Sequence, residues 1–328
     1  MFTETLKGTH YEIGYQVGKK MRDHGRGLPE YVKDLKEENI QFALATEREV
    51  KPMIAGLLKE VDGIAEGGGY PRNIILTLAL TLGRMAGCTA LAAISEREKG
   101  NKTIFARNYD GPSDCREFTL YKTYPDDGFS HIGCCWDLLV GREDGINDAG
   151  LAIAVNGVHG VYNDRLGVWD HIPVRAVLDN CENTGKAVKL LRRIPHLFAK
   201  NFLVTDAKGD VAIVEASQQN VAVHYSRSNF GVITNHFTSN TMRQYNSPKL
   251  KMLRTEERMR NAKAWLQERS GQIDVNALKR LLTDATDGVC SNKEGFSTTW
   301  SWIAQCGKRS IELATGAPVQ GDYDRFEF

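Results

Sequence analysis

GCTALA, residues 87–92, stands where a helical pattern gives way to a β-rich one, and IFARNYD, residues 104–110, follows it. The second stretch is an apolar strand that ends in the polar and charged side chains of Arg107, Asn108 and Asp110. Charged groups at a strand end, close to a small-residue turn, are typical of a functional site. An ion pair that only caps the strand would give the same pattern, so spacing alone leaves both interpretations open.

The chain on the N-terminal side of Cys88 has the pattern of helices. Helices are expected in residues 12–22, 29–45 and 47–66, because apolar residues recur there at intervals of three to four. A glycine run at residues 67–69 should end the third helix, and Pro71 can begin a fourth.

The chain on the C-terminal side of Cys88 is rich in short β-type runs separated by turn residues. Strands are expected at residues 103–107, 118–124, 131–140, 151–155, 202–205, 211–215, 221–225, 231–234, 298–304 and 309–314. Helices interrupt this series only in places, for example at residues 172–180 and 184–193. Because strands and helices do not alternate strictly, the pattern disfavours a doubly wound parallel sheet and favours an α+β layered fold.

The composition is that of an ordinary globular protein. The chain has 328 residues, of which 41% are hydrophobic and 25% charged, with 42 basic and 41 acidic residues and a net charge of +1. This balance excludes intrinsic disorder and argues against nucleic acid or an anionic membrane as the main partner. The longest apolar stretch, residues 74–82, is far shorter than the roughly 18 residues of a membrane span.

The seven cysteines and the metal-binding residue types show no recognisable spacing. The number of cysteines is odd and no pair has C-x-x-C spacing, which predicts free thiols in a reducing compartment. The N-terminus lacks the apolar segment of a signal peptide, so a cytoplasmic location is expected. Without ligands clustered at metal spacing, neither a metal ion nor another cofactor is expected.

Five segments, in order along the chain, carry a resemblance to a known family. They are residues 8–18, Cys88-Thr89 followed by residues 106–110, residues 145–151 leading into 154–157, residues 173–187 and residues 231–236. Together they resemble the choloylglycine hydrolase superfamily. More closely they are similar to the peptidase C45 group, which includes the acyl-coenzyme A:6-aminopenicillanic acid acyltransferases.

The resemblance implies an N-terminal nucleophile hydrolase with a four-layer αββα sandwich and a helical N-terminal segment. Such a protein is made as a precursor and cuts itself before the nucleophile, here between Gly87 and Cys88. Residues 1–87 would then be a helical pro-segment or small subunit, and residues 88–328 the catalytic part of one compact unit. The cut frees an α-amino group with a reference pKa of about 7.7–8.0, so nucleophile and base would lie on one residue.

The resemblance also implies roles for individual residues. Cys88 would be the nucleophile, Asp110 would orient its amine, and Arg107 would lower the pKa of the thiol. Asn235 would donate to the oxyanion and Asn156 would position substrate or oxyanion, although asparagine at strand ends also serves simply to form turns. Candidates for contacts with the substrate are Tyr109, His236 and Trp300.

The expected activity is hydrolysis of a linear carbon–nitrogen amide bond in a small N-acyl substrate, through a thioester acyl-enzyme. Two alternatives stay open: an acyltransferase that passes the acyl group to an amine, and an uncut, catalytically silent binding protein. A homo-oligomer is compatible with the expected activity and with both alternatives. Bile-salt hydrolases of the superfamily carry a further site arginine in a late Ser-rich strand, and residues 297–301 contain none. This difference favours the C45 group over bile-salt activity.

Overall fold

A computed structural model describes most of the chain. The described residues are 1–23, 28, 32, 35–81, 86–95, 103–112, 118–136, 140–158, 165–246, 254–286, 289–319 and 322–328. Cys115 lies outside these ranges. No helix among them is both long and apolar enough to cross a membrane.

The first sheet contains eight strands among the described residues, in the order β1-β4-β5-β6-β7-β8-β9-β10. Apart from the parallel pair β1 and β4, its strands are antiparallel neighbours. The bounds are β1 Phe2–Gly8, β4 Thr119–Pro125, β5 His131–Cys135, β6 Asp144–Asn147, β7 Ala152–Gly157, β8 Lys200–Thr205, β9 Val211–Ala216 and β10 Val221–Tyr225.

The second sheet has the described order β11-β2-β3-β13-β14-β15, with the short β12 paired to β13. All of its pairs are antiparallel. The bounds are β2 Gly87–Ile94, β3 Thr103–Pro112, β11 Phe230–Ile233, β12 Asn292–Lys293, β13 Phe296–Gln305, β14 Ser310–Thr315 and β15 Asp324–Glu327. The strand β2 therefore runs directly across the predicted cleavage point.

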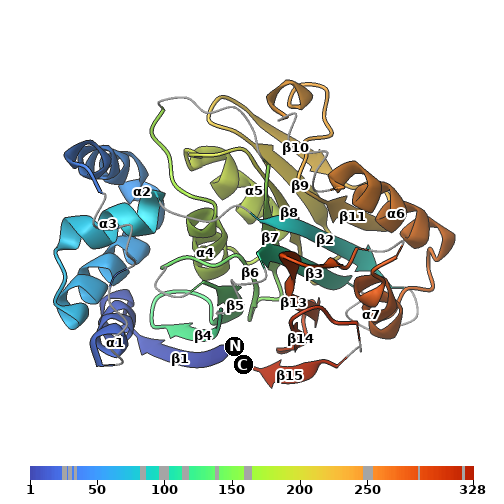
Figure 1. The fold of residues 1–328 in the computed structure, drawn as a ribbon, viewed down its shortest axis with the longest axis horizontal. Helices are drawn as coiled ribbons and strands as arrows, with labels where there is room; N and C mark the ends of the chain where they lie inside the picture. The colour runs from blue at the N-terminus through green and yellow to red at the C-terminus, as the bar shows by residue number, and fades with distance from the viewer. Residues whose placement is uncertain are drawn as a thin grey trace.

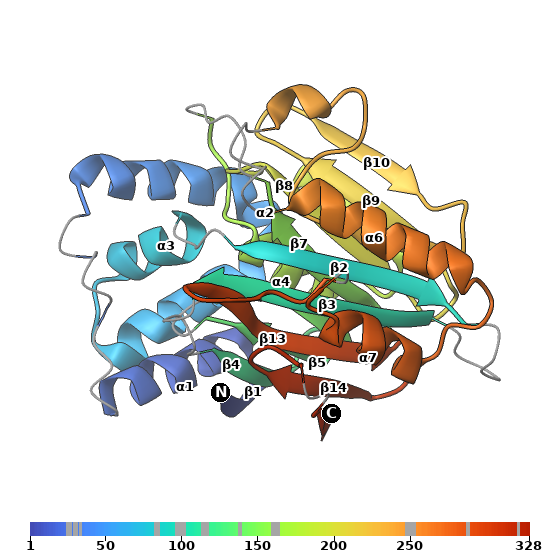
Figure 2. The same cartoon turned by 45° about the vertical axis from the view of Figure 1, so that its right-hand side comes forward.

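Helices cover the outer faces of both sheets, as Figures 1 and 2 show. Helices α4 (His171–Asn180) and α5 (Thr184–Arg193) pack on the first sheet through an apolar cluster that includes Val177 and Phe202. Helices α6 (Thr255–Glu268) and α7 (Val275–Thr283) cover the second sheet in the same way. A large core that contains Phe105 and Trp302 fills the space between the sheets. The layers are thus αββα, which confirms the predicted fold class.

The front of the chain differs in two respects from the predicted series of helices. Its first residues form strand β1, which extends the first sheet instead of standing apart from it. Helix α2 (Glu37–Gly68) is one long element where two helices were expected, and residues 29–31 and 33–34 of that prediction lie outside the described ranges. A kink at Ile54 follows Pro52, since proline removes a backbone donor and clashes with the preceding turn.

Helices α1 (His10–Asp23), α2 and α3 (Arg72–Thr81) form a layer beside the sandwich (Figure 1). The backbones of α1 and α2 approach each other closely at small residues. A Cβ atom added to Gly14 would lie 2.1 Å from the carbonyl oxygen of Glu60, and one added to Gly63 would lie 2.1 Å from that of Tyr11. Glycine is therefore required at both positions by the close helix contact.

A buried network of charges joins this front layer to the sandwich. Glu60 of α2 accepts hydrogen bonds from Arg175 of α4 at 2.5 and 3.1 Å, and its carboxylate lies 2.8 Å from His10 Nδ1. Arg175 also donates to Asp179 at 2.9 Å. Although burial opposes ionisation, Arg175 and then His131 hold the pKa of the Asp179 carboxyl below its usual range. Removal of one partner would leave a neighbouring charge buried without compensation.

We expect Glu60→Gln to lower the free energy of unfolding by about 3 kcal/mol, because it removes one of the two carboxylates that are paired with the buried Arg175. Urea unfolding measures this difference. Glu49→Gln is the matched control, since Glu49 is an exposed residue of the same helix and should change stability by less than about 0.5 kcal/mol. Equal effects of the two substitutions would mean that the network does not hold the front layer in place.

Candidate active site

Cys88 lies at the start of β2, between β11 and β3 of the second sheet. Its backbone pairs with Tyr109 of β3, so the side chains near the end of β3 surround it. The residue is buried, with 1% of its surface exposed, and Gly87 precedes it within the same strand. Residues 87–92 and 104–110 are therefore neighbours in space.

The Cys88 thiol has two hydrogen-bond donors. Arg107 Nη2 lies 3.3 Å from Sγ, and the backbone N–H of Asp110 also donates to the sulfur. Burial nevertheless raises the pKa of the Cys88 thiol to about 11, and the positive charge of Arg107 offsets this effect only in part. The thiol is thus protonated near neutrality and needs a base before it can act as a nucleophile.

Arg107 is also held by acceptors in and next to strands β6 and β7 of the first sheet. Its Nη1 donates to Asp144 Oδ2 at 2.9 Å and to the Glu143 carbonyl at 2.5 Å, while Nη2 donates to the Val155 carbonyl at 2.5 Å. The guanidinium also lies 4.9 Å from the centre of the Tyr109 ring. These contacts orient the guanidinium group so that its Nη2 atom faces the Cys88 sulfur.

Asp110 is the only carboxylate among the five residues predicted to be catalytic, and it is fully buried. Its Oδ1 accepts a hydrogen bond from Thr298 Oγ1 at 2.7 Å. Burial raises the pKa of Asp110 to about 6, against the lowering effects of Arg258, Thr298 and Arg107. The group therefore changes its charge close to physiological pH.

Asn235, which follows β11, binds the chain on both sides of the predicted cleavage point. Its Oδ1 accepts from the Cys88 N–H at 2.8 Å, and its Nδ2 donates to the Ala86 carbonyl at 2.9 Å. Asn156 of β7 donates to the Cys88 carbonyl at 3.2 Å. The structure thus brings together the five residues predicted to be catalytic, although they are spread over almost 150 positions of the chain.

Arg258 of α6 is a site residue that the sequence did not reveal. Its Nη1 donates to the Cys88 carbonyl and to Thr89 Oγ1, each at 2.6 Å, and its Nη2 donates to Asn235 Oδ1 at 2.7 Å. Arg258 shares the buried face of α6 with Met259, Ala262 and Leu266, so a charged residue in the register of an apolar face is the signal that could have found it.

The residues predicted to contact substrate lie in different surroundings. Tyr109 and Trp300 are stacked, with ring centres 3.8 Å apart, and both are buried in the core between the sheets. The Trp300 indole donates to Asp144 Oδ2 at 2.9 Å. His236 is 8% exposed, and its Nδ1 lies 2.9 Å from Thr255 Oγ1. Contact of any of the three with a substrate stays a prediction.

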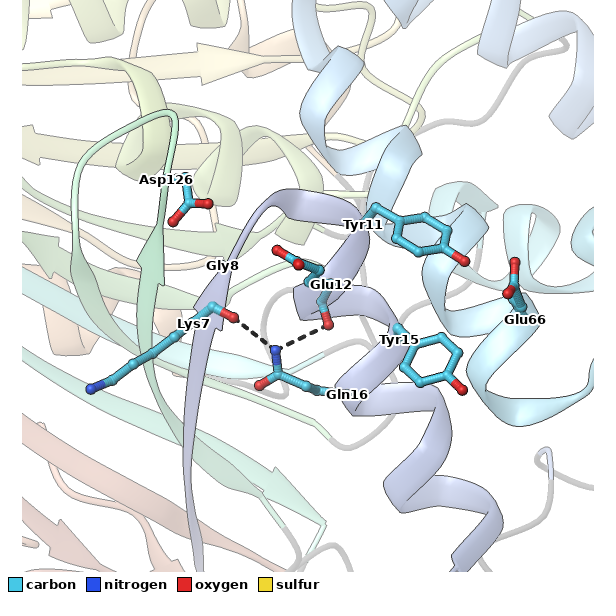
Figure 3. Close-up of a pocket in the computed structure, with 8 residues that line it drawn as sticks. All are labelled: Lys7, Gly8, Tyr11, Glu12, Tyr15, Gln16, Glu66 and Asp126. Carbon is cyan, nitrogen blue, oxygen red and sulfur yellow. Dashed lines mark hydrogen bonds between the residues drawn. The ribbon is translucent and has the colours of Figure 1, made fainter.

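A surface pocket of about 750 Å³ lies away from these residues, between the front layer and the first sheet (Figure 3). None of the residues predicted for catalysis or substrate binding lines it. Gln16 is one of the residues that line it and donates to the carbonyls of Lys7 and Glu12. The lining residues are Lys7, Gly8, Tyr11, Glu12, Tyr15, Gln16, Glu66 and Asp126.

Comparison with solved structures agrees with the fold. A variant of conjugated bile acid hydrolase from Clostridium perfringens has a TM-score of 0.51 and 14% identity, over 73% of this chain and 92% of that one. The Caenorhabditis elegans ortholog of N-acylethanolamine-hydrolyzing acid amidase has a TM-score of 0.50 and 16% identity, over 67% and 93%. Penicillin V acylase from Agrobacterium tumefaciens has a TM-score of 0.49 and 18% identity, over 70% and 83%.

At the level of sequence, no curated protein matches the chain. A family model does match, over residues 97–320, which is well over half of the chain. Its description is acyl-coenzyme A:6-aminopenicillanic acid acyl-transferase, in agreement with the resemblance found in the motifs. By name, the family and the structural neighbours are acyltransferases, an acylase, a hydrolase and an amidase. The chain belongs to the acyl-coenzyme A:6-aminopenicillanic acid acyl-transferase family.

Proposed function

We propose that this chain cuts itself between Gly87 and Cys88 and then hydrolyses the amide bond of a small N-acyl substrate through a thioester at Cys88. The observation that carries the proposal is that one amide group, that of Asn235, accepts a hydrogen bond from the Cys88 N–H and donates one to the Ala86 carbonyl, on either side of Gly87. The same peptide segment presents the sulfur to Arg107. The scissile bond and its nucleophile are thus held together in the uncut chain.

The cut would be an intramolecular acyl shift. Sγ of Cys88 attacks the Gly87 carbonyl carbon, the carbon–nitrogen bond breaks, and the thiol proton passes to the departing amine nitrogen. Water then hydrolyses the thioester, which leaves a carboxylate on Gly87 and both the thiol and a free α-amine on Cys88. Asp110, whose carboxylate is buried at this end of β3, would stabilise the positive charge that the new amine can carry.

In turnover the α-amine would take the thiol proton while Sγ attacks the substrate carbonyl. Asn235 Nδ2 binds the Ala86 carbonyl in the uncut chain, so withdrawal of that residue would free this donor for the oxyanion. Fixed donors of this kind are worth about 2.7–4 kcal/mol in acyl transfer. Arg258, bound to the Cys88 carbonyl, would keep the nucleophilic residue in place after the cut.

Residues 1–87 should stay attached to residues 88–328 after the cut. Strand β1 is hydrogen-bonded along its length to β4, and Glu60 of the front layer is paired with Arg175 of the sandwich. Both contacts are remote in sequence from the cleavage point and do not depend on the peptide bond that breaks. We therefore propose two fragments in one compact unit.

The test combines an intact mass spectrum with a panel of N-acyl amides of different acyl lengths. We expect two fragments that begin at Met1 and Cys88, release of free amine, and a transient mass increase equal to the acyl group on the second fragment. An active protein in which every chain is uncut would contradict the free-amine mechanism. A wholly uncut protein without an acyl adduct would instead indicate a binding protein.

Acyl transfer is the second candidate, and the description of the matched family favours it. Hydrolase and transferase share the thioester and differ in whether water or an amine resolves it. Adding a primary amine to the reaction separates them. A transferase would form the new amide in preference to the free acid, at amine concentrations far below that of water.

A further inference from the structure

Three potential metal ligands meet in the interior, beside the residues that hold Arg107. One ligand atom from each of Glu143, Asp170 and His171 lies within 4.8 Å of the other two. Glu143 directly precedes β6, Asp170 is the N-cap of α4, and His171 is the first residue of that helix. Their exposed fractions are 4%, 7% and 0%, so the cluster is nearly closed to solvent.

Two polar atoms of these residues, Asp170 Oδ1 and His171 Nδ1, are buried and have no hydrogen-bond partner in the part of the chain that the structure describes. The other ring nitrogen of His171, Nε2, lies 2.9 Å from the Ala79 carbonyl. A carbonyl oxygen can only accept, so Nε2 carries the ring proton and Nδ1 presents a lone pair. Metal-bound histidines typically donate their second ring nitrogen in this way.

The positive charge nearby does not balance the two carboxylates. Lys200 of β8 and Arg107 are the buried cations that act on both of them. Lys200 Nζ donates to the Val168 carbonyl at 3.3 Å, and Arg107 is already paired with Asp144 at 2.9 Å. Lys200 therefore compensates one of the two carboxylates. A proton shared by Glu143 and Asp170 could supply the second charge, but it would leave the His171 lone pair without a partner. A cation can accept electron pairs from all three side chains at once.

We propose that Glu143, Asp170 and His171 form a binding site for a divalent first-row transition metal ion. Two carboxylate oxygens and one imidazole nitrogen suit Zn²⁺ or Mn²⁺, whereas Ca²⁺ and Mg²⁺ prefer oxygen ligands alone. In a tetrahedral zinc site with bonds of about 2.0–2.1 Å, ligand atoms lie about 3.3 Å apart, so the three side chains would contract around the ion.

The ion would support the catalytic region without touching the substrate. Arg107 Nη1 donates to the backbone carbonyl of Glu143, and Arg107 Nη2 points to the Cys88 sulfur. An ion that ties Glu143 to the start of α4 would stiffen the backbone on which Arg107 rests. Sequence spacing did not reveal the site, because Glu143 lies 27 positions before Asp170.

The experiment uses the purified full chain, stripped with a chelator and titrated with Mn²⁺ while electron paramagnetic resonance follows the free ion. Manganese is the first probe because the cysteines, which bind zinc well, bind it poorly. We expect one Mn²⁺ per chain, displacement by Zn²⁺, and a melting temperature that rises with metal concentration as mass action requires. No stoichiometric binding and no shift in melting temperature would overturn the proposal in favour of a shared proton.

Variants locate the ion. Asp170→Asn and His171→Gln should each weaken Mn²⁺ binding by more than about tenfold. His196→Gln is the matched control: His196 is buried, its Nε2 lies 2.8 Å from the Leu191 carbonyl, and its Nδ1 has no partner among the described residues, yet it is outside the cluster. The control should bind as the wild type does. Unchanged affinity in folded Asp170→Asn, checked by circular dichroism, would overturn the assignment even if the wild type binds metal.

Discussion

Cys88→Ala is expected to leave a single uncut chain of 328 residues without hydrolase activity. Alanine has nearly the same backbone preferences and fits the small buried position, so the fold should survive. It has no atom that can attack the Gly87 carbonyl, and it offers no nucleophile to a substrate. Both the cut and the turnover should therefore be lost together, which intact mass and an amide-hydrolysis assay measure on the same sample.

Cys88→Ser separates the two steps. A hydroxyl can perform the same acyl shift, so slow cleavage is expected, but the resulting serine should be a much poorer catalyst. Cys306→Ala is the control. Cys306 is as buried as Cys88 and belongs to the same core between the sheets, but it directly follows the C-terminal end of β13. This variant should be cut and active. Cleavage of the Cys88→Ala chain at Gly87 would mean that another group is the nucleophile.

Asp110→Asn is expected to lower the acylation rate by about a hundredfold or more, with little loss of stability. The amide has the shape of the carboxyl group but not the charge that would balance the Cys88 amine, and hydrogen bonds to charged groups are roughly twice as strong as neutral ones. Rapid-quench kinetics on the cut fraction measures acylation, and urea unfolding measures stability. Asp274→Asn is a suitable control, because asparagine caps helix α7 as well as aspartate does.

The pH dependence of stability gives this substitution a second readout. The pKa of Asp110 is raised to about 6 in the fold, chiefly by burial, against about 3.9 in an unfolded chain. Between these two pH values the folded state binds more protons than the unfolded chain. Asp110 therefore lowers the free energy of unfolding as the pH rises from about 4 to about 6. Asp110→Asn should lack this contribution. A variant that is fully active and merely less stable would show that Asp110 only caps its strand.

Local pattern was sufficient for much of the architecture. The apolar periodicity at residues 184–193 predicted α5 at its observed bounds, and the run at residues 221–225 predicted β10. The change from a helical to a β-type sequence pattern at Gly87 correctly placed the start of the β-rich part. Apolar residues recur every 3.6 positions in a helix and every 2 in a strand, and these two periods can be told apart within a few residues. Motifs near Cys88, Asn156 and Asn235 indicated the family, because each combines a special side chain with a turn at a strand end.

Contacts between distant segments could be found only in the folded chain. Residues 2–8 became a strand because β4, more than a hundred positions away, offers its edge to them. Arg258 reaches Cys88 because α6 lies across β2 and β11 (Figure 2); the period of α6 places Arg258 on the buried face, but not beside Cys88. The cluster of Glu143, Asp170 and His171 has the same origin. Periodicity reports which face of an element is buried, whereas the packing of whole elements decides which polar groups meet on that face.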